Sequence, residues 1–317
     1  MTPTFALQQS GSSRPSFPGL GALVLVLVLV LVAACGEGGD GARCERDDQC
    51  VSGFCRADGT CAPEGADAGA GVDADPAQPD GATGACAPDN DRIVSRDEVP
   101  LEAGRSARFR VALDATIDSA GTMMVDGTRR WALGQTLAGD ADVDLTLLAP
   151  AGQWWAPEFP AATYAAPLSA ESDLLGVFEV SATQVRLLGV VSPSAGLTRT
   201  ELSYDPPVPV LQLPLTTTSR WMVSSTVSGL ATGVLSVYSE DYTFAVDAVG
   251  ALTTPYGEFP VLRVASDLER TVGVLTTPRR SFAFVAECFG TVATVVSQDF
   301  EDGREFTDAA EVRRLAP

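Results

Sequence analysis

Between residue 86 and the C-terminus, apolar and polar residues alternate along the chain with a period of two. Side chains two positions apart on a β-strand lie on the same face of a sheet, so this alternation predicts half-buried, mainly antiparallel strands. The apolar positions of the clearest runs are Phe109, Val111, Leu113 and Ile117; Val143, Leu145 and Leu147; Tyr242, Phe244 and Val246; and Phe282, Phe284 and Ala286.

Turn-forming residues separate these runs, and long amphipathic helix patterns are almost absent. The scarcity of helices argues against parallel α/β folds, although short helices are predicted at 168–175 and 308–315. The 232 residues from 86 to 317 are enough for one core. We therefore expect one all-β domain over 86–317, mainly antiparallel, built as a curved sheet, a half-barrel or a sandwich. The expected turns include Asp126-Gly127, Ala151-Gly152, Asp205-Pro206-Pro207, Pro255-Tyr256-Gly257 and Asp302-Gly303.

The N-terminal part of the chain has the pattern of an export signal. Residues 20–34 carry no charge, and they follow an arm that contains Arg14 and no acidic residue. This apolar stretch is shorter than the ~20 residues that a transmembrane helix needs. Residues 1–34 are therefore predicted to be a signal peptide.

The sequence Val32-Ala33-Ala34-Cys35 resembles the lipobox of bacterial lipoproteins. The resemblance implies that Cys35 becomes the mature N-terminus and is acylated, so that the lipid bilayer is a partner of the chain. The alternative is an ordinary signal peptide cut near Ala34, with Cys35 in a disulfide. Gly36, where enterobacterial sorting would read Asp, favours the outer membrane of a Gram-negative cell envelope, and residues 35–43 are expected to be a flexible tether.

Four cysteines lie close together in residues 44–61, with five, four and five residues between successive cysteines. Eighteen residues cannot bury a core, so two disulfides are expected to hold this module in an oxidising compartment. The sequence leaves three pairings open, and a zinc site is disfavoured by export and by the lack of C-x2-C pairs. Asp47-Asp48 and Gly53 resemble the short Cys-rich repeats of myxobacterial and other deltaproteobacterial surface lipoproteins. The four cysteines are Cys44, Cys50, Cys55 and Cys61.

Two further cysteines, Cys86 and Cys288, mark the beginning and the last strands of the β domain. We expect them to form a disulfide, and the alternative for Cys288 is a free buried thiol. Between this domain and the Cys-rich module, residues 62–85 contain no aromatic residue and one β-branched aliphatic residue, Val72. Such a segment is expected to be a disordered linker.

Charge and composition exclude several kinds of function. The formal net charge is −20, which makes nucleic acid an unlikely partner because phosphate binding needs a basic face. The chain has no histidine and no lysine, so Ser-His and Cys-His nucleophile pairs, Schiff-base lysines and histidine metal sites are ruled out. We expect no cofactor, no metal and no enzymatic activity, and the remaining catalytic alternative is an Asp/Glu-dependent hydrolase.

An aromatic cluster is the candidate ligand site. Exposed aromatic pairs stack on sugars or fill a hydrophobic cup, whereas the structural alternative is a loop that buries both tryptophans. Its residues are Trp154, Trp155, Phe159 and Tyr164.

Several charged pairs and clusters are expected to have structural explanations. The acids at 140, 142 and 144 begin like a calcium loop, but Leu145 occupies the position that needs glycine, and strand alternation explains them as a solvated face. The acids of 89–91 are expected to form a turn. The arginine pairs 129–130 and 279–280 are candidate anion contacts, with solvated charges as the default.

The segment from Tyr204 to Ser297 resembles uncharacterised envelope and lipoprotein families. The resemblance rests on Thr254-Pro255-Tyr256-Gly257 with the following Phe-Pro-Val-Leu-Arg-Val, and on the segment from Asp205 to Trp221. It implies the incurved half-barrel of lipoprotein carriers of the LolA, LolB and LppX kind. The expected function is thus a non-enzymatic, membrane-anchored envelope lipoprotein that binds a protein or polysaccharide, and the alternative is a carrier of a lipid or hydrophobic ligand.

Overall fold

The computed structural model describes residues 86–317. The predicted signal peptide, tether, Cys-rich module and linker lie outside the described residues, as do Cys35, Cys44, Cys50, Cys55 and Cys61. Among the described residues, no helix is long and apolar enough to cross a membrane.

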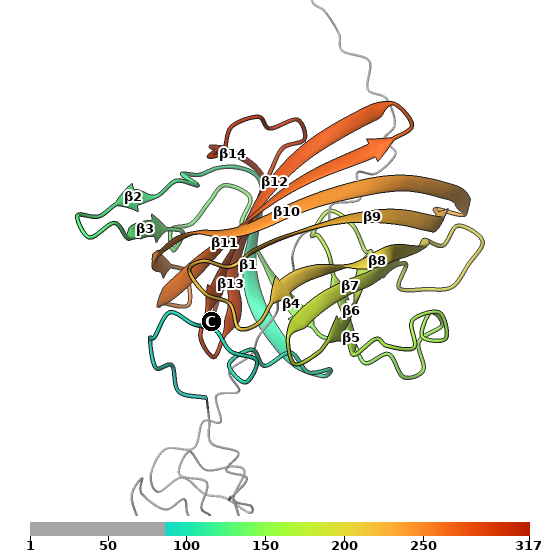
Figure 1. The fold of residues 1–317 in the computed structure, drawn as a ribbon, viewed down its shortest axis with the longest axis horizontal. Helices are drawn as coiled ribbons and strands as arrows, with labels where there is room; N and C mark the ends of the chain where they lie inside the picture. Colours follow the sequence, from blue (N-terminus) through green and yellow to red (C-terminus); the bar gives the residue numbers. More distant parts are fainter. Residues whose placement is uncertain (1–85) are drawn as a thin grey trace, which may run out of the picture.

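Fourteen strands form one sheet, which is antiparallel except where β3 pairs with β10 (Figure 1). The main path runs β4-β1-β14-β13-β12-β11-β10-β9-β8-β7-β6-β5, so most neighbours in the sheet are also neighbours in the sequence. The strands are β1 Ser106–Thr116, β2 Thr122–Met123, β3 Arg129–Ala132, β4 Ala141–Thr146, β5 Tyr164–Pro167, β6 Leu175–Val180, β7 Gln184–Val191, β8 Glu201–Gln212, β9 Arg220–Ala231, β10 Val234–Thr253, β11 Glu258–Val272, β12 Leu275–Ala286, β13 Gly290–Ser297 and β14 Asp308–Leu315.

The two ends of this path approach each other, so the sheet curves into a half-barrel. Beyond β4, Leu148 and the β5 residue Ala165 form an isolated bridge, with N–H to O distances of 2.7 and 2.9 Å. The all-β, mainly antiparallel fold predicted from the sequence is therefore confirmed, and so is the curved sheet.

The longest hairpin, β10–β11, confirms the turn predicted at Pro255 and Gly257. Thr254 donates its N–H to the carbonyl of Gly257 at 2.8 Å, and Leu252 pairs with Phe259 across the turn. The turn lies at the same end of the half-barrel as β3, which pairs with the last residues of β10.

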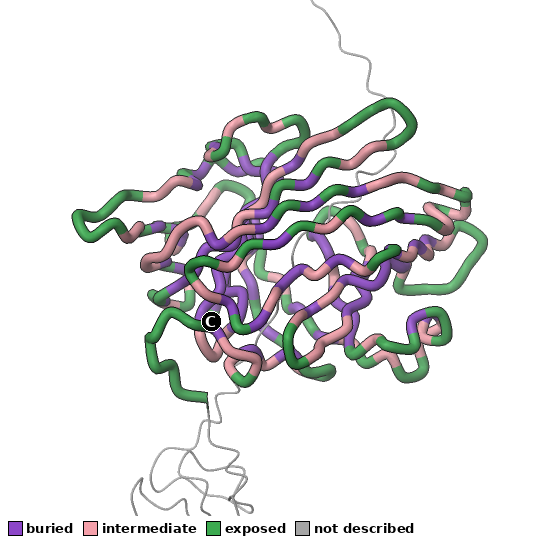
Figure 2. The backbone as a smooth tube through the Cα atoms, in the orientation of Figure 1, coloured by how far each residue is buried: buried purple, intermediate pink, exposed green. Residues whose placement is uncertain are grey.

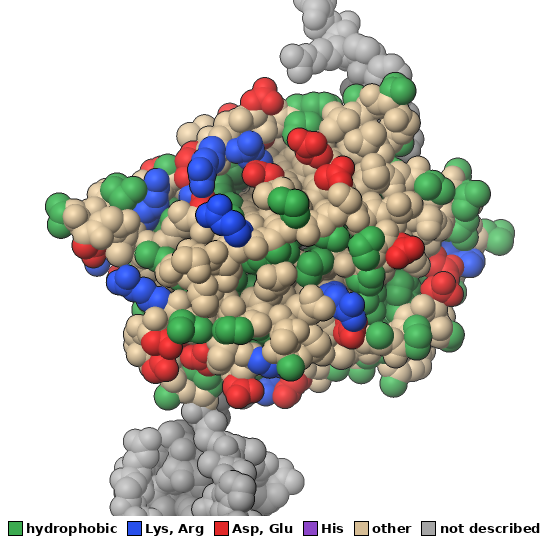
Figure 3. Space-filling model, in the orientation of Figure 1, with side chains coloured by type: hydrophobic (Ala, Val, Ile, Leu, Met, Phe, Trp, Pro, Cys, Tyr) green, Lys and Arg blue, Asp and Glu red, His purple; other side chains and the backbone are tan. Residues whose placement is uncertain are grey.

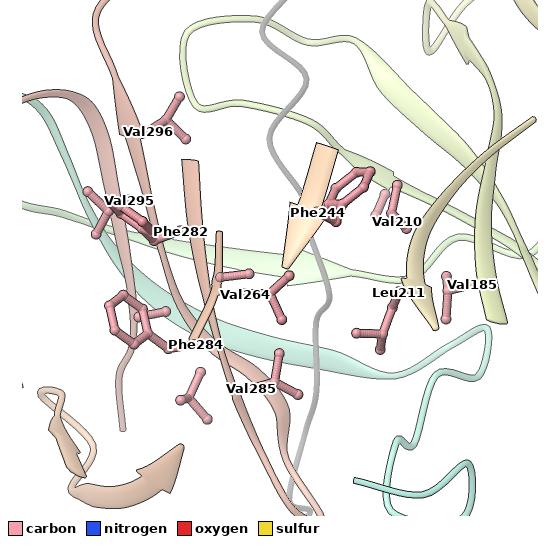
Figure 4. Close-up of a cluster of buried hydrophobic side chains, with 14 of the residues drawn as sticks. Val185, Val210, Leu211, Phe244, Val264, Phe282, Phe284, Val285, Val295 and Val296 are labelled. Carbon is pink, nitrogen blue, oxygen red and sulfur yellow. The ribbon is translucent and has the colours of Figure 1, made fainter. Parts of the chain in front are cut away.

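Both faces of β13 and of the last residues of β12 are buried, so the core has two layers there (Figure 2). We call the face that carries Tyr242 and Phe244 the inner face, because it lines the hollow of the half-barrel. The opposite, outer face carries Phe282 and Phe284, which pack against Phe306 and Trp131 at ring distances of 5.5 and 5.0 Å. Figure 4 shows the side chains that β7, β8 and β10–β13 contribute to this core.

The two predicted short helices are wrong. Residues 168–175 form a turn and the first residue of β6, and residues 308–315 form β14. The 308–315 sequence suits a helix locally, but it lies between β1 and β13 and hydrogen-bonds to both. Pairing on both sides and burial of nearly the whole strand outweigh its local preference.

Leu113 also departs from the predicted alternation. Leu113 is 38% exposed, whereas Phe109 and Val111 are buried as expected. After Val111 the next buried residue is Ala112 rather than Leu113, and Asp114 has a φ of +49°. This local irregularity turns Leu113 outward, which an even spacing of apolar residues does not reveal.

Candidate functional site

A wide groove lies at one end of the half-barrel, with a volume of about 1170 Å³. The β9–β10 and β11–β12 hairpins, the β5–β6 and β7–β8 loops and the start of β8 surround it. The residues that line it are Ser169, Glu171–Leu174, Ser192–Gly196, Thr198–Thr200, Leu202, Ala231, Thr232, Leu235–Tyr238, Arg270, Val272, Thr277 and Asp299.

The outer edge of the groove is apolar and exposed. Leu235 and Val237 on β10 are 76% and 63% exposed, and Val272 on β11 is 53% exposed. Figure 3 shows hydrophobic side chains at the right-hand margin of the molecule, where the β9–β10 hairpin lies in Figure 1. A ligand that enters the groove therefore meets apolar side chains first.

Behind the groove, a cluster of polar and aromatic side chains supports Arg270 and Tyr238, which line it. Glu240 on β10 is fully buried, and Arg270 on β11 donates to its carboxylate at 2.7 Å. Tyr242 donates its hydroxyl to the other oxygen of Glu240 at 2.5 Å. The guanidinium of Arg270 lies 5.6 Å from the ring centre of Tyr238, and Tyr204 completes the cluster from β8.

The shifted pKa values in this cluster indicate that its side chains keep their protons near neutral pH. Burial raises the pKa of Tyr242 and Tyr204 well above the ordinary value, and the negative charge of Glu240 raises it further. Burial alone would lower the pKa of Arg270, but Glu240 and the tyrosines outweigh that effect and the pKa is raised. The tyrosines therefore stay protonated and Arg270 stays charged near neutral pH, so these groups hold hydrogen bonds rather than exchange protons.

The sequence did not single out this cluster, although it contains a signal that could have done so. Extending the inner-face alternation of Tyr242, Phe244 and Val246 by one step places the charged Glu240 on the same buried face. Its partner could not be read from the sequence, because the register of β10 and β11 decides that Glu240 lies opposite Arg270.

Three of the four residues of the predicted aromatic cluster are buried, so the structure agrees with the alternative of a loop that buries its rings rather than with exposed aromatics. Trp155, Phe159 and Tyr164 are 0%, 5% and 0% exposed. Trp155 and Phe159 pack on the side of β5–β7 that forms a second small core, and Tyr164 stacks on Phe178 in the main core. The apolar residues of β6 and β7 give the loop a surface to bury its rings against, which its own composition does not show.

Trp154 is half-buried and supports the groove from behind. Its indole N–H donates to the carbonyl of Ser192 at 3.1 Å, and Arg199 lies 5.5 Å from its ring centre. Both partners line the groove, so Trp154 holds the β7–β8 loop in place.

Cys86 and Cys288 form the predicted disulfide, which is thus confirmed, with their Cα atoms 5.5 Å apart. The bond joins the start of the described chain to the β12–β13 turn. Because β12 runs from the groove end to this turn, the disulfide lies at the opposite end of the half-barrel from the groove.

The acids at 140, 142 and 144 are bound by arginines, as a structural interpretation expects. Asp142 and Asp144 pair across the strand with Arg110 and Arg108 at 3.0 and 2.9 Å, and Asp140 pairs with Arg314. These contacts use the carboxylate oxygens that a calcium ion would need.

The carboxylates of Asp89, Asp91 and Glu287 lie within 4.8 Å of one another. Backbone N–H groups of Asn90 and Ile93 donate to Glu287 and Asp91 at 2.7 Å each, and Asp91 donates its N–H to Asp89 at 3.1 Å. The arrangement matches the expected turn.

The arginine pairs are not uniformly solvated. Arg279 is 9% exposed and donates to the carbonyl of Ser297, and Arg280 lies 3.4 Å from Asp267. Arg129 donates to the carbonyl of Ala120, and Arg130 is exposed and 3.9 Å from Glu258. Burial of Arg279 contradicts the default of a solvated charge, because β12 is covered on its inner face.

Comparisons with protein family models, with curated proteins and with solved structures found no match. The groove and its cluster are therefore the features of the described residues from which a function can be inferred.

Proposed function

We propose that this chain is a non-enzymatic, membrane-anchored protein of the cell envelope that binds its ligand in the groove of the half-barrel. The groove supports this proposal because it combines an apolar edge with hydrogen-bonding groups on its wall, as ligand sites do. The anchor is Cys35, through the lipobox resemblance.

The lining favours a ligand with both apolar and hydrogen-bonding parts. Apolar side chains such as Leu235 and Val237 line the groove together with serines, threonines and Arg270, which is paired with the buried Glu240 behind it. A carrier that encloses an acyl chain is less well supported, since the inner face below the cluster is filled by side chains such as Phe244 and Val264. Trp154 and Trp155, which that alternative would place in the cavity, lie outside it.

Native mass spectrometry of the full chain, extracted from membranes in mild detergent, tests the proposal. We expect a mature chain that begins at an acylated Cys35 and retains a non-covalent ligand. Leu235→Glu places a charge on the groove edge, which costs about 1–3 kcal/mol of binding and weakens ligand affinity about 5- to 150-fold.

Met222→Glu is the matched control for this experiment. Met222 is 77% exposed, like Leu235 at 76%, but it does not line the groove. Retention of the same ligand by wild type and Leu235→Glu, or a wild-type chain with no ligand, would contradict binding in the groove.

A further inference from the structure

Three loops border the groove, and together with the strand residues that flank them they contain no charged residue, although 20% of the chain is charged. The uncharged stretches are residues 187–198 (the end of β7 and the loop after it), 221–239 (most of β9, the β9–β10 turn and the start of β10) and 271–278 (the β11–β12 turn with the strand ends beside it). Charged side chains are normally found at a protein surface, so their absence from all three stretches gives this end of the domain a surface of low charge.

The ends of these loops carry large apolar side chains that project into solvent. We call them the apolar tips. Leu197 and Val274 are 96% and 104% exposed, and Val234, Leu235, Val272 and Leu275 are 65%, 76%, 53% and 58% exposed. Gly233 and Gly273 have φ values of +80° and +62°, which allow the tight turns that push these side chains outward.

The apolar tips lie around the mouth of one groove. Gly233 donates its N–H to the carbonyl of Arg199 at 2.8 Å, which joins the β9–β10 turn to the β7–β8 loop. Ser239 pairs with Thr271, so the β11–β12 hairpin continues beside the β9–β10 hairpin. Figure 2 shows exposed residues at both hairpin ends.

Acidic residues at this end line the groove and are absent from the tips. Glu171, Asp173 and Asp299 are groove residues. With a formal net charge of −20, the chain is repelled by anionic surfaces, and its uncharged tips are the part that can approach an apolar phase.

We propose that the apolar tips insert into the interfacial region of an uncharged lipid bilayer, so that the groove opens onto the membrane surface. This inference rests on the proposed function, because the bilayer is the one that holds Cys35. The free energy of the system falls when exposed Val and Leu side chains leave water for this region.

The length of chain before the domain permits this orientation. Cys35 and Cys86 are 51 residues apart in the sequence, which spans at most about 180 Å when fully extended. The 20-residue strand β10, the longest element, is about 65 Å long. A chain anchored at Cys35 and leaving the domain at the disulfide end can therefore bring the opposite end to the membrane.

A fluid bilayer fits the shape of this surface better than a second copy of the chain. The tips project separately around a hollow of about 1170 Å³, and a rigid, flat partner would leave that hollow unfilled. A dimer would also bring together two chains of the same strong negative charge.

Fluorescence quenching in vesicles tests the proposal with a pair of matched variants. Val274→Trp places the probe on an apolar tip, and Val125→Trp places it on the β2–β3 turn; the native valines are 104% and 108% exposed. The full, acylated chain is reconstituted into phosphatidylcholine vesicles with bromine on the acyl chains, and the wild-type signal of the four native tryptophans is subtracted.

We expect the added fluorescence of Val274→Trp to be blue-shifted and quenched at least about twofold more than that of Val125→Trp, because interfacial side chains lie at the depth of the upper acyl chain. Equal quenching of the two variants would overturn the proposal. A blue shift of Val274→Trp that depends on protein concentration, without quenching, would show a second copy on the tips and would also overturn it.

Failure of the anchor would be seen separately. The mass of the purified chain reports acylation at Cys35 directly, whereas vesicles added to a chain without acyl groups still report whether the tips reach the bilayer. Unchanged circular dichroism of both variants is required, and it is expected because both sites are fully exposed.

Discussion

Strands β10 and β11 carry two buried ion pairs with different surroundings. On the inner face, Glu240 pairs with Arg270 at 2.7 Å, and on the outer face Asp247 pairs with Arg263 at 2.8 Å. Both pairs consist of an acid from β10 and an arginine from β11. An irregularity in the register between Val246 and Ala248 separates them.

The outer pair is closed on every side. Arg263 donates to both oxygens of Asp247, to both oxygens of Glu305 and to the carbonyl of Ser119, at distances from 2.6 to 3.0 Å. Its guanidinium also lies 4.1 Å from the ring centre of Phe282. With the side chains of Arg263 and Asp247 only 2% exposed, this pair joins β10, β11 and the 298–307 loop and has a structural role.

The inner pair borders the groove. The Arg270 side chain is 18% exposed and lines the groove, while Glu240 is fully buried behind it. The comparison teaches that the same acid–arginine pairing joins strands where the fold surrounds it, and presents its arginine to the proposed ligand groove where the fold leaves one partner at a hollow. The predictions below test this difference.

The largest effect is expected for Arg263→Met. Methionine keeps much of the aliphatic volume but leaves Asp247 and Glu305 without their cation, so the free energy of unfolding should fall by about 3–5 kcal/mol. Urea denaturation followed by tryptophan fluorescence measures this change. Arg130→Met is the control, because Arg130 is exposed and its ion pair with Glu258, at 3.9 Å, is also exposed; a loss of similar size there would contradict a special role of Arg263.

A smaller effect is expected for Glu240→Gln. The amide oxygen of glutamine can still accept from Arg270, and its NH2 group can donate to the Tyr242 hydroxyl oxygen. Arg270 can also gain solvation at the groove, so the loss of stability should be about 1–2 kcal/mol. The same denaturation experiment measures it. A loss as large as that of Arg263→Met would show that the inner pair is as closed as the outer one.

The smallest effect is the response of the two clusters to pH, which should have opposite directions. Burial opposes ionisation of Glu305, but the hydrogen bonds and charge of Arg263 prevail, and its pKa is lowered. The contribution of Glu305, on the order of 1 kcal/mol, is therefore present above the unfolded-state pKa of about 4.3. It should be lost as the pH falls through the lower folded-state pKa.

For the inner cluster the direction reverses. The pKa of Tyr242 and of Tyr204 is raised by burial and by Glu240, so their protonated forms are favoured in the folded chain. Stability is then complete below the unfolded-state value of about 10 and declines as the pH rises above it. Unfolding measured across pH should show less acid dependence in Glu305→Gln and less alkaline dependence in Tyr242→Phe; exchange of these two effects would contradict the assignment.

Local sequence patterns predicted the secondary structure correctly where buried and exposed side chains alternate regularly along a strand. The alternation of Tyr242, Phe244 and Val246 and the turn at Pro255 both appear in the structure, because side-chain direction and turn geometry depend on neighbouring residues. Local preference failed at 308–315, where two neighbouring strands impose the extended conformation, and at Leu113, where an irregular residue shifts the buried phase.

The sequence by itself determined the all-β class, the hairpin at Pro255 and the pairing of Cys86 with Cys288, because periodicity, turn residues and an even cysteine count act locally or by number. Only the tertiary structure decided that Trp155 is buried, that Glu240 meets Arg270, and that three uncharged loops surround one groove. Those outcomes depend on strand register and on the curvature of the sheet, which bring together residues up to about a hundred positions apart in the chain.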